Sequence, residues 1–154
     1  MKATAKKYPF PAHVRLVRDR NSYPKLTEMP RIGCVYDSEK ILREIVGEEL
    51  QEVFVGLWLN NRSRVISHTV ITRGLVDSCL VHPREVFRHA LAAGAVGIIV
   101  AHNHPSGDPT PSAEDKAITR MLVESGKILD IPVYDHIIIG ETGRYTSFAA
   151  AGLL

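Results

Sequence analysis

Apolar residues in the middle of the chain form short continuous runs that are typical of buried strands. Residues 96–101 are apolar and largely β-branched, which predicts a strand covered on both faces. Residues 52–59 carry apolar side chains at odd and even positions alike, which predicts a second central strand. The pair Asn60-Asn61 follows and favours a hairpin turn into a third strand at residues 65–72.

Between these runs, apolar residues spaced three and four apart predict three helices. The first is expected to begin at Ser38 and to end near Gly47, and the second to extend from Pro83 to Gly94. The third is expected to be capped by Ser112 and to continue to about residue 129. Two final strands are expected at residues 133–140 and 145–148. Because strands and helices alternate, the pattern favours one layered α/β or α+β domain over residues 31–154.

The N-terminal segment, residues 1–30, differs from the rest in composition and charge. Eight Lys or Arg residues lie within residues 1–31 against only Asp19 and Glu28, although the net charge of the whole chain is only +2. Four prolines predict a loosely structured basic arm, in which residues 13–18 alternate enough to form one edge strand. Such an arm can attract nucleic acid through phosphate contacts, but a segment of this kind is more often a solubilising tail.

Other features of the composition narrow the class of protein. We find neither a long apolar run that could span a membrane nor the apolar segment of a secretory signal at the start, so we expect a cytoplasmic protein with no membrane partner. Cys34 and Cys79 are far apart and form no Cys-x-x-Cys pair. We therefore expect neither a disulfide framework nor a thiolate zinc site, and we expect both cysteines to be small buried residues.

The chemistry-bearing residues follow the buried strand at residues 96–101. In an extended chain, residues two apart point to the same side, so His102 and His104 can present both imidazoles to one point beyond the strand. A loop rich in Pro and Gly lets the chain reverse, and the first turn of the next helix can then offer Asp115 as a third ligand. Two nitrogens and one oxygen suit zinc, and a fourth position left open for water is typical of a catalytic site.

Two interpretations need no metal. Ser112 and Asp115 also fit a helix-capping pattern, in which the hydroxyl accepts from the start of the helix and the acid favours its positive end. A His-x-His pair alone arises easily by chance in a chain with seven histidines. The combination of a buried strand, a Pro/Gly-rich loop and a capped helix favours the metal site.

The motif from His102 to Asp115, His-Asn-His-Pro-Ser-Gly-Asp-Pro-Thr-Pro-Ser-Ala-Glu-Asp, resembles the His-x-His, ten residues, Asp signature of the JAB/MPN (JAMM) metallopeptidases. Residues 81–85, 95–100 and 135–140 are similar to the RadC branch in particular, and the resemblance extends over about residues 38–150. It implies a single domain with a mixed β-sheet packed between α-helices, a deaminase-like fold. It also implies zinc bound by His102, His104 and Asp115.

The same resemblance assigns roles to two further residues. It implies that Glu52 is the general acid/base, taking a proton from zinc-activated water and returning it to the leaving amine. It also implies that Ser112 hydrogen-bonds the developing oxyanion, a contact worth about 3–4 kcal/mol in comparable sites. From the residues alone, Glu52 is interpreted as a solvated carboxylate at the end of a strand, and Ser112 as a helix cap. The expected activity is a zinc-dependent hydrolase of the metallopeptidase or isopeptidase type, acting on a peptide or protein substrate.

Several points limit this expectation. Asn103 occupies the position where eukaryotic deubiquitinating members have a small hydroxyl residue, so a ubiquitin-like isopeptide is not indicated as substrate. RadC proteins carry an N-terminal helix-hairpin-helix region, which the first thirty residues do not resemble. Alternatives are a DNA-repair-associated nucleic-acid-binding factor and a non-catalytic binding module with a retained metal site.

For His136 we prefer a satisfied buried histidine over a contact to a metal ligand. The sequence indicates no substrate identity and no oligomeric state.

Overall fold

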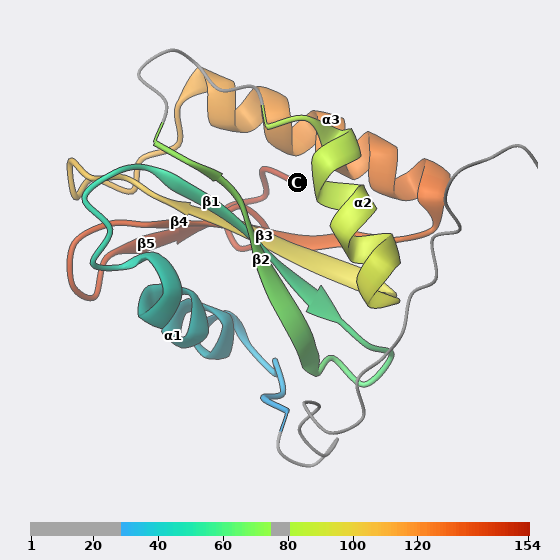
Figure 1. Ribbon diagram of the computed structural model, residues 1–154. Coiled ribbons are helices and arrows are strands. Elements are labelled where there is room, and N and C mark those ends of the chain that lie inside the picture. The colour runs from blue at the N-terminus through green and yellow to red at the C-terminus, as the bar shows by residue number, and fades with distance from the viewer. Residues whose placement is uncertain (1–28, 75–80) are drawn as a thin grey trace, which may run out of the picture.

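A computed structural model describes residues 29–74 and 81–154 as a five-stranded sheet with helices on both faces (Figure 1). The strands are β1 (Val53–Leu59), β2 (Val65–Arg73), β3 (Gly97–Asn103), β4 (Val133–Ile139) and β5 (Tyr145–Ser147). The helices are α1 (Val35–Val46), α2 (Pro83–Ala93) and α3 (Ala113–Leu129). The strand order is β2-β1-β3-β4-β5, with β3 and β4 parallel and the other neighbours antiparallel. The predicted α/β class with a mixed sheet between helices is confirmed.

The two faces of the sheet bury different sets of residues, because side chains alternate along each strand. Helix α1 packs against one face, and α2 and α3 cover the other (Figure 1). On β3, Ile99 and Ala101 belong to the core beneath α1, whereas Ile98 and Val100 belong to the core beneath α2 and α3. The alternation continues to the end of the strand. It therefore directs His102 toward the α2/α3 face and Asn103 toward α1.

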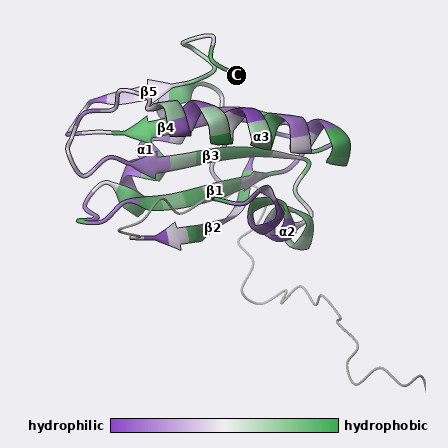
Figure 2. Cartoon of the chain, turned by 90° about the horizontal axis from the view of Figure 1, so that it is seen from above, coloured by the Kyte–Doolittle hydropathy of each residue, from purple (hydrophilic) through white to green (hydrophobic). Residues whose placement is uncertain are grey.

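Hydropathy agrees with this layered arrangement. Figure 2 shows β1 and β3 coloured mainly as hydrophobic, whereas α3 alternates between hydrophobic and hydrophilic residues along its length. All seven residues of β1 and all seven of β3 are buried. Both central strands are thus covered on both faces, as their continuous apolar runs predict.

The ends of the elements differ from prediction at two places that matter. Helix α1 begins at Val35, about one turn before the predicted start at Ser38, because the Asp37 carboxylate accepts hydrogen bonds from the backbone N–H groups of Gly33 and Cys34. Strand β3 continues past residue 101 to Asn103, because it pairs there with the last residues of β4. The second helix begins at Pro83 as predicted, and Gly94 ends it with a left-handed φ of 69°.

Other predictions concern residues that contribute little to the site or that the structure does not describe. Cys34 is exposed, so the prediction that it is buried is wrong; it lies in the turn that precedes α1, outside the two packed layers. Cys79, the basic arm up to residue 28 and the edge strand expected at residues 13–18 lie outside the described residues. Within residues 29–74 and 81–154, every helix is too short or too polar to cross a membrane.

Candidate metal centre

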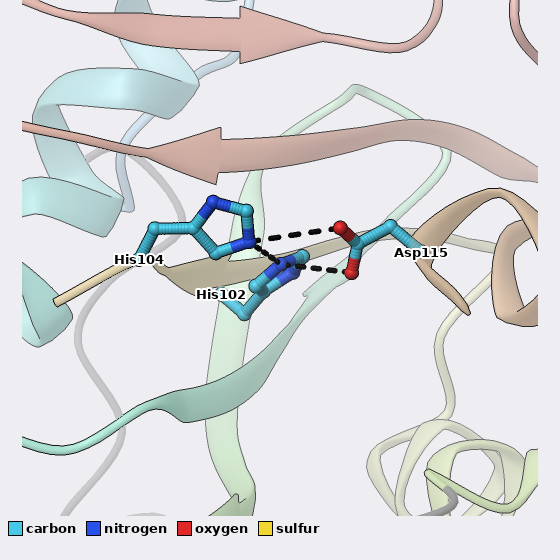
Figure 3. Close-up of side chains that lie close together, drawn as sticks. All are labelled: His102, His104 and Asp115. Atoms are coloured by element: carbon cyan, nitrogen blue, oxygen red, sulfur yellow. Dashed lines mark hydrogen bonds and ion pairs between the residues drawn. The ribbon is translucent and has the colours of Figure 1, made fainter. Parts of the chain in front are cut away.

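The three predicted ligands come from the end of β3, the loop after it and the first turn of α3. His102 is only 1% exposed and is fixed between neighbouring strands, since it pairs with Phe54 of β1 and with Ile138 of β4. His104 follows the strand, and its backbone N–H donates to the carbonyl of Ile139 at 2.9 Å. Asp115 lies three residues after the helix cap Ser112 and is buried. Figure 3 shows the three side chains pointing toward one another.

Distances between the ligand atoms fit a tetrahedral zinc ion. His102 Nε2 lies 3.0 Å from His104 Nε2 and 3.1 Å from Asp115 Oδ1, and His104 Nε2 lies 3.6 Å from Asp115 Oδ2. Ligands bound tetrahedrally at about 2.0–2.1 Å are separated from one another by about 3.3–3.4 Å. One ligand atom from each residue lies within 4.8 Å of the other two, so among the described residues these three side chains form the group that could hold a metal ion.

A buried hydrogen-bonded chain determines which nitrogen of His102 carries its proton. The Thr119 hydroxyl donates to the backbone carbonyl of Asp115 at 2.6 Å, so it can only accept from His136 Nδ1, also at 2.6 Å. His136 Nε2 is then unprotonated and accepts from His102 Nδ1 at 2.9 Å. With its proton on Nδ1, His102 presents the lone pair of Nε2 to the metal position.

The second imidazole is oriented by a separate contact. His104 Nδ1 lies 2.7 Å from the backbone carbonyl of Asp108, which can only accept a hydrogen bond. The proton of a neutral His104 is thereby held on Nδ1, and its Nε2 lone pair also points at the metal position. Both histidines are therefore prepared as ligands by partners on their far nitrogens, as is common in zinc sites.

Charge in the site favours a cation. Burial raises the pKa of Asp115, but its contacts with both imidazoles and with the Ser112 side chain hold that pKa well below its usual range. The hydrogen bond with Asp115 raises the pKa of His104, against the effect of burial. Burial lowers the pKa of His136 well below its ordinary value, so this imidazole is neutral. A divalent cation requires deprotonated ligands, and an ionised carboxylate beside an imidazole that can give up its proton meets this requirement.

Helix capping and metal ligation turn out to be compatible functions of Ser112 and Asp115. The Ser112 hydroxyl accepts from the Asp115 backbone N–H at 3.0 Å, and the Ser112 backbone N–H donates to Asp115 Oδ2 at 2.8 Å. The hydroxyl also donates to Asp115 Oδ2 at 2.6 Å. These contacts fix the carboxylate with Oδ1 facing His102. The capping interpretation is therefore correct for the helix, and it is compatible with the metal interpretation because the cap orients a candidate ligand.

Glu52 lies next to this group but does not belong to it. It is exposed and immediately precedes β1, where Phe54 pairs with His102 and stacks on its ring. If the antiparallel register is continued by two residues, Glu52 is opposite His104 and faces the same side of the sheet. Its charge contributes to the raised pKa of His104. The catalytic roles of Glu52 and Ser112 remain predictions.

Two residues that sequence reasoning missed or undervalued are His136 and Thr119. His136 is fully buried, as predicted, but it also contacts His102, so the preference for a histidine without a role at the site is wrong. Thr119 follows Asp115 by four residues and therefore lies on the same face of α3. This spacing of four residues is the feature of the sequence that could have indicated a contact between Thr119 and the site. The His82 ring caps α2, and Trp58 is buried in the core.

A groove of about 1040 Å³ lies on the α1 side of the sheet end, and it reaches His104 and Asn103. Its walls are α1, the loop after it and the turn between β4 and β5. Several glutamates line it, including Glu44, Glu48 and Glu141. The groove provides space for a ligand beside His104, one of the three candidate metal ligands.

Comparison with known proteins matches residues 32–153 to the family described as "RadC-like JAB domain". A UPF0758 protein of Symbiobacterium thermophilum is 50% identical over 103 residues, which are 67% of this chain and 44% of that protein. A UPF0758 protein of Geobacter sulfurreducens is 49% identical over 68% of this chain and 45% of its own length. One of Methanosarcina mazei is 45% identical over 80% of this chain and 54% of its own. The chain spans about half the length of these curated relatives.

Proposed function

Since the chain belongs to the RadC-like JAB domain family, we propose that it is a zinc-dependent hydrolase of the metallopeptidase or isopeptidase type. The observation that carries this proposal is the convergence of His102 Nε2, His104 Nε2 and one Asp115 oxygen, with the far nitrogen of each imidazole tied to another partner. Two nitrogens and one oxygen favour zinc over magnesium or calcium, which prefer oxygen ligands alone. Three protein ligands leave a fourth position open.

The protein's own groups supply the remaining parts of an amide hydrolysis. Zinc, when bound, would polarise the substrate carbonyl and acidify water. Glu52 would accept a proton from the attacking water and return it to the leaving nitrogen as the C–N bond breaks and the C–O bond forms. Its exposed position beside His104 leaves it accessible to substrate. The Ser112 hydroxyl would exchange its contact with Asp115 for one with the developing oxyanion.

The most informative experiment screens the full chain, loaded with zinc, against peptide libraries. Glu52→Gln serves as the matched control, because it keeps the shape of the side chain and removes its basicity. We expect cleavage by the wild-type protein, loss of at least a hundredfold in Glu52→Gln, and loss of activity with a zinc chelator. If Glu52→Gln is as active as the wild type, the proposed role of Glu52 is wrong.

Two other functions would give different results. A non-catalytic module with a retained metal site binds zinc but cleaves no peptide in the screen. A nucleic-acid-binding factor that uses the basic arm binds DNA in a way that weakens steeply with salt and disappears when residues 1–31 are deleted.

A further inference from the structure

The side chain between the two histidine ligands makes three hydrogen bonds on the opposite side of the sheet. Asn103 is the last residue of β3, is 3% exposed, and faces the loop that joins α1 to β1. Its Oδ1 accepts from the Val53 backbone N–H at 2.8 Å. Its Nδ2 donates to the backbone carbonyls of Glu49 and Gln51, both at 3.0 Å.

These contacts lie on both sides of Glu52 in the sequence. The carbonyl of residue 51 and the N–H of residue 53 are held by Asn103, and the carbonyl of Glu52 itself accepts from the Gly74 N–H at 2.8 Å. The backbone around Glu52 is therefore fixed by hydrogen bonds while its carboxylate remains exposed. One residue of β3 thus connects the strand that carries the metal ligands to the segment that carries the acid.

An asparagine suits this position for a chemical reason. The contacts require one acceptor and two donors from a single short side chain, which the carboxamide provides. Aspartate would place a second acceptor against the two carbonyls of residues 49 and 51. Serine offers one donor and is too short to reach three partners. An amide that is lost here leaves the buried Val53 N–H without its partner and removes one donor from each of the two partly buried carbonyls.

We propose that Asn103 is a positioning residue, which holds residues 49–53 so that Glu52 lies beside the metal position. This inference rests on the proposed function, because it gives Asn103 an effect that acts through Glu52. The β1–β3 register provides the direction: Phe54 is opposite His102, so the order imposed on residues 51–53 places the carboxylate next to His104. Asn103 then links the orientation of the acid to that of the ligands on either side of it.

The first test measures the contact itself on the full chain without metal. Amide hydrogen exchange of Val53 should become at least about tenfold faster in Asn103→Ser, because its N–H loses a buried acceptor. Asn60→Ser is the matched control, since Asn60 Oδ1 accepts from two backbone N–H groups in the β1–β2 turn, at the other end of β1. Asn60→Ser should leave Val53 unchanged. If the Asn103 variant does not fold, slow exchange of the Asn103 side-chain N–H groups in the wild-type protein decides the question.

The second test measures the effect at the metal, with Co²⁺ in place of zinc because its visible absorption reports the site. A negative charge beside the cobalt ion opposes the loss of a proton from water bound to that ion. Because Glu52→Gln removes such a charge, the pH midpoint of the spectral change should fall by about one unit. Asn103→Ser should also lower this midpoint. The midpoint of the double variant should equal that of Glu52→Gln alone. Cobalt should bind all three variants with the same stoichiometry.

The outcomes separate this inference from the proposed function. If Glu52→Gln shifts the midpoint but Asn103→Ser does not, or if the two shifts add, Asn103 does not act through Glu52 and only the inference is overturned. An unshifted Glu52→Gln spectrum refutes the proposed role of Glu52, and the positioning role with it. Unprotected Asn103 side-chain N–H groups or an unchanged Val53 exchange rate show that the amide does not hold the segment.

Discussion

Replacing Thr119 by valine tests the buried chain that orients His102. The substitution keeps the branched shape and removes the hydroxyl that accepts from His136 Nδ1 and donates to the Asp115 carbonyl. Without that acceptor, the His136 proton is better placed on Nε2, where it can donate to His102 Nδ1 at 2.9 Å. His102 must then carry its own proton on Nε2, the atom that faces the metal.

The magnitude of the effect follows from the cost of restoring the metal-binding tautomer. Binding zinc returns the His102 proton to Nδ1 and leaves the His136 Nδ1–H buried without a partner, at a cost of about 1–3 kcal/mol. Each 1.4 kcal/mol corresponds to about tenfold in affinity, and outer partners of zinc ligands typically contribute about ten- to a hundredfold. We therefore expect zinc affinity to fall by about ten- to a hundredfold.

Competition with a chromophoric zinc chelator measures this change at fixed pH, and ¹H–¹⁵N spectra of the imidazoles report the tautomers directly. Thr69→Val is the matched control, because the Thr69 hydroxyl also accepts from a ring N–H, that of Trp58 at 3.0 Å, on a strand away from the site. Unchanged zinc affinity in Thr119→Val, or an equal loss in Thr69→Val, would refute the reasoning.

Three further predictions concern the ionisation, the cap and the core. Contact with Asp115 raises the pKa of His104 in the metal-free protein. The stability contributed by this contact is therefore complete below the ordinary histidine pKa of about 6.5, and it is lost as the pH rises through the raised pKa of His104. Apparent zinc affinity, measured by chelator competition, should correspondingly fall about tenfold per pH unit below that value and level off above it; a pH-independent affinity contradicts this. Ser112→Ala should lower the free energy of unfolding by about 0.5–2 kcal/mol in urea through loss of the cap, and an unchanged midpoint opposes that assignment. Leu42→Ala, at a fully buried position on the side of α1 that faces the sheet, should cost about 2–5 kcal/mol yet leave zinc affinity unaltered, whereas lost zinc binding in the folded variant would contradict separate roles for core and site.

Local sequence patterns were sufficient to predict the three candidate ligands. The buried strand before His102 is visible as an apolar run, the two-residue spacing to His104 follows from strand geometry, and Ser112 marks the helix start that delivers Asp115. Each of these depends on neighbours within a few residues. The prediction that the three side chains converge is borne out by the ligand distances.

The supporting contacts depend on pairing between distant segments, which local patterns do not contain. His136 reaches His102 only because β4 lies parallel to β3 in one particular register, across 34 residues of sequence. Asn103 contacts residues about 50 positions earlier, through the antiparallel pairing of β1 with β3. The early start of α1 was missed for another reason, because Asp37 caps the helix from inside its first turn rather than from the position before it.

Metal content is the most direct test of the claim that His102, His104 and Asp115 bind one divalent ion. Elemental analysis of the purified full chain after equilibration with zinc should give about one zinc per chain for the wild type and much less for His104→Ala and Asp115→Ala. Folding of both variants is checked by circular dichroism. Equal zinc in all three proteins would contradict the account.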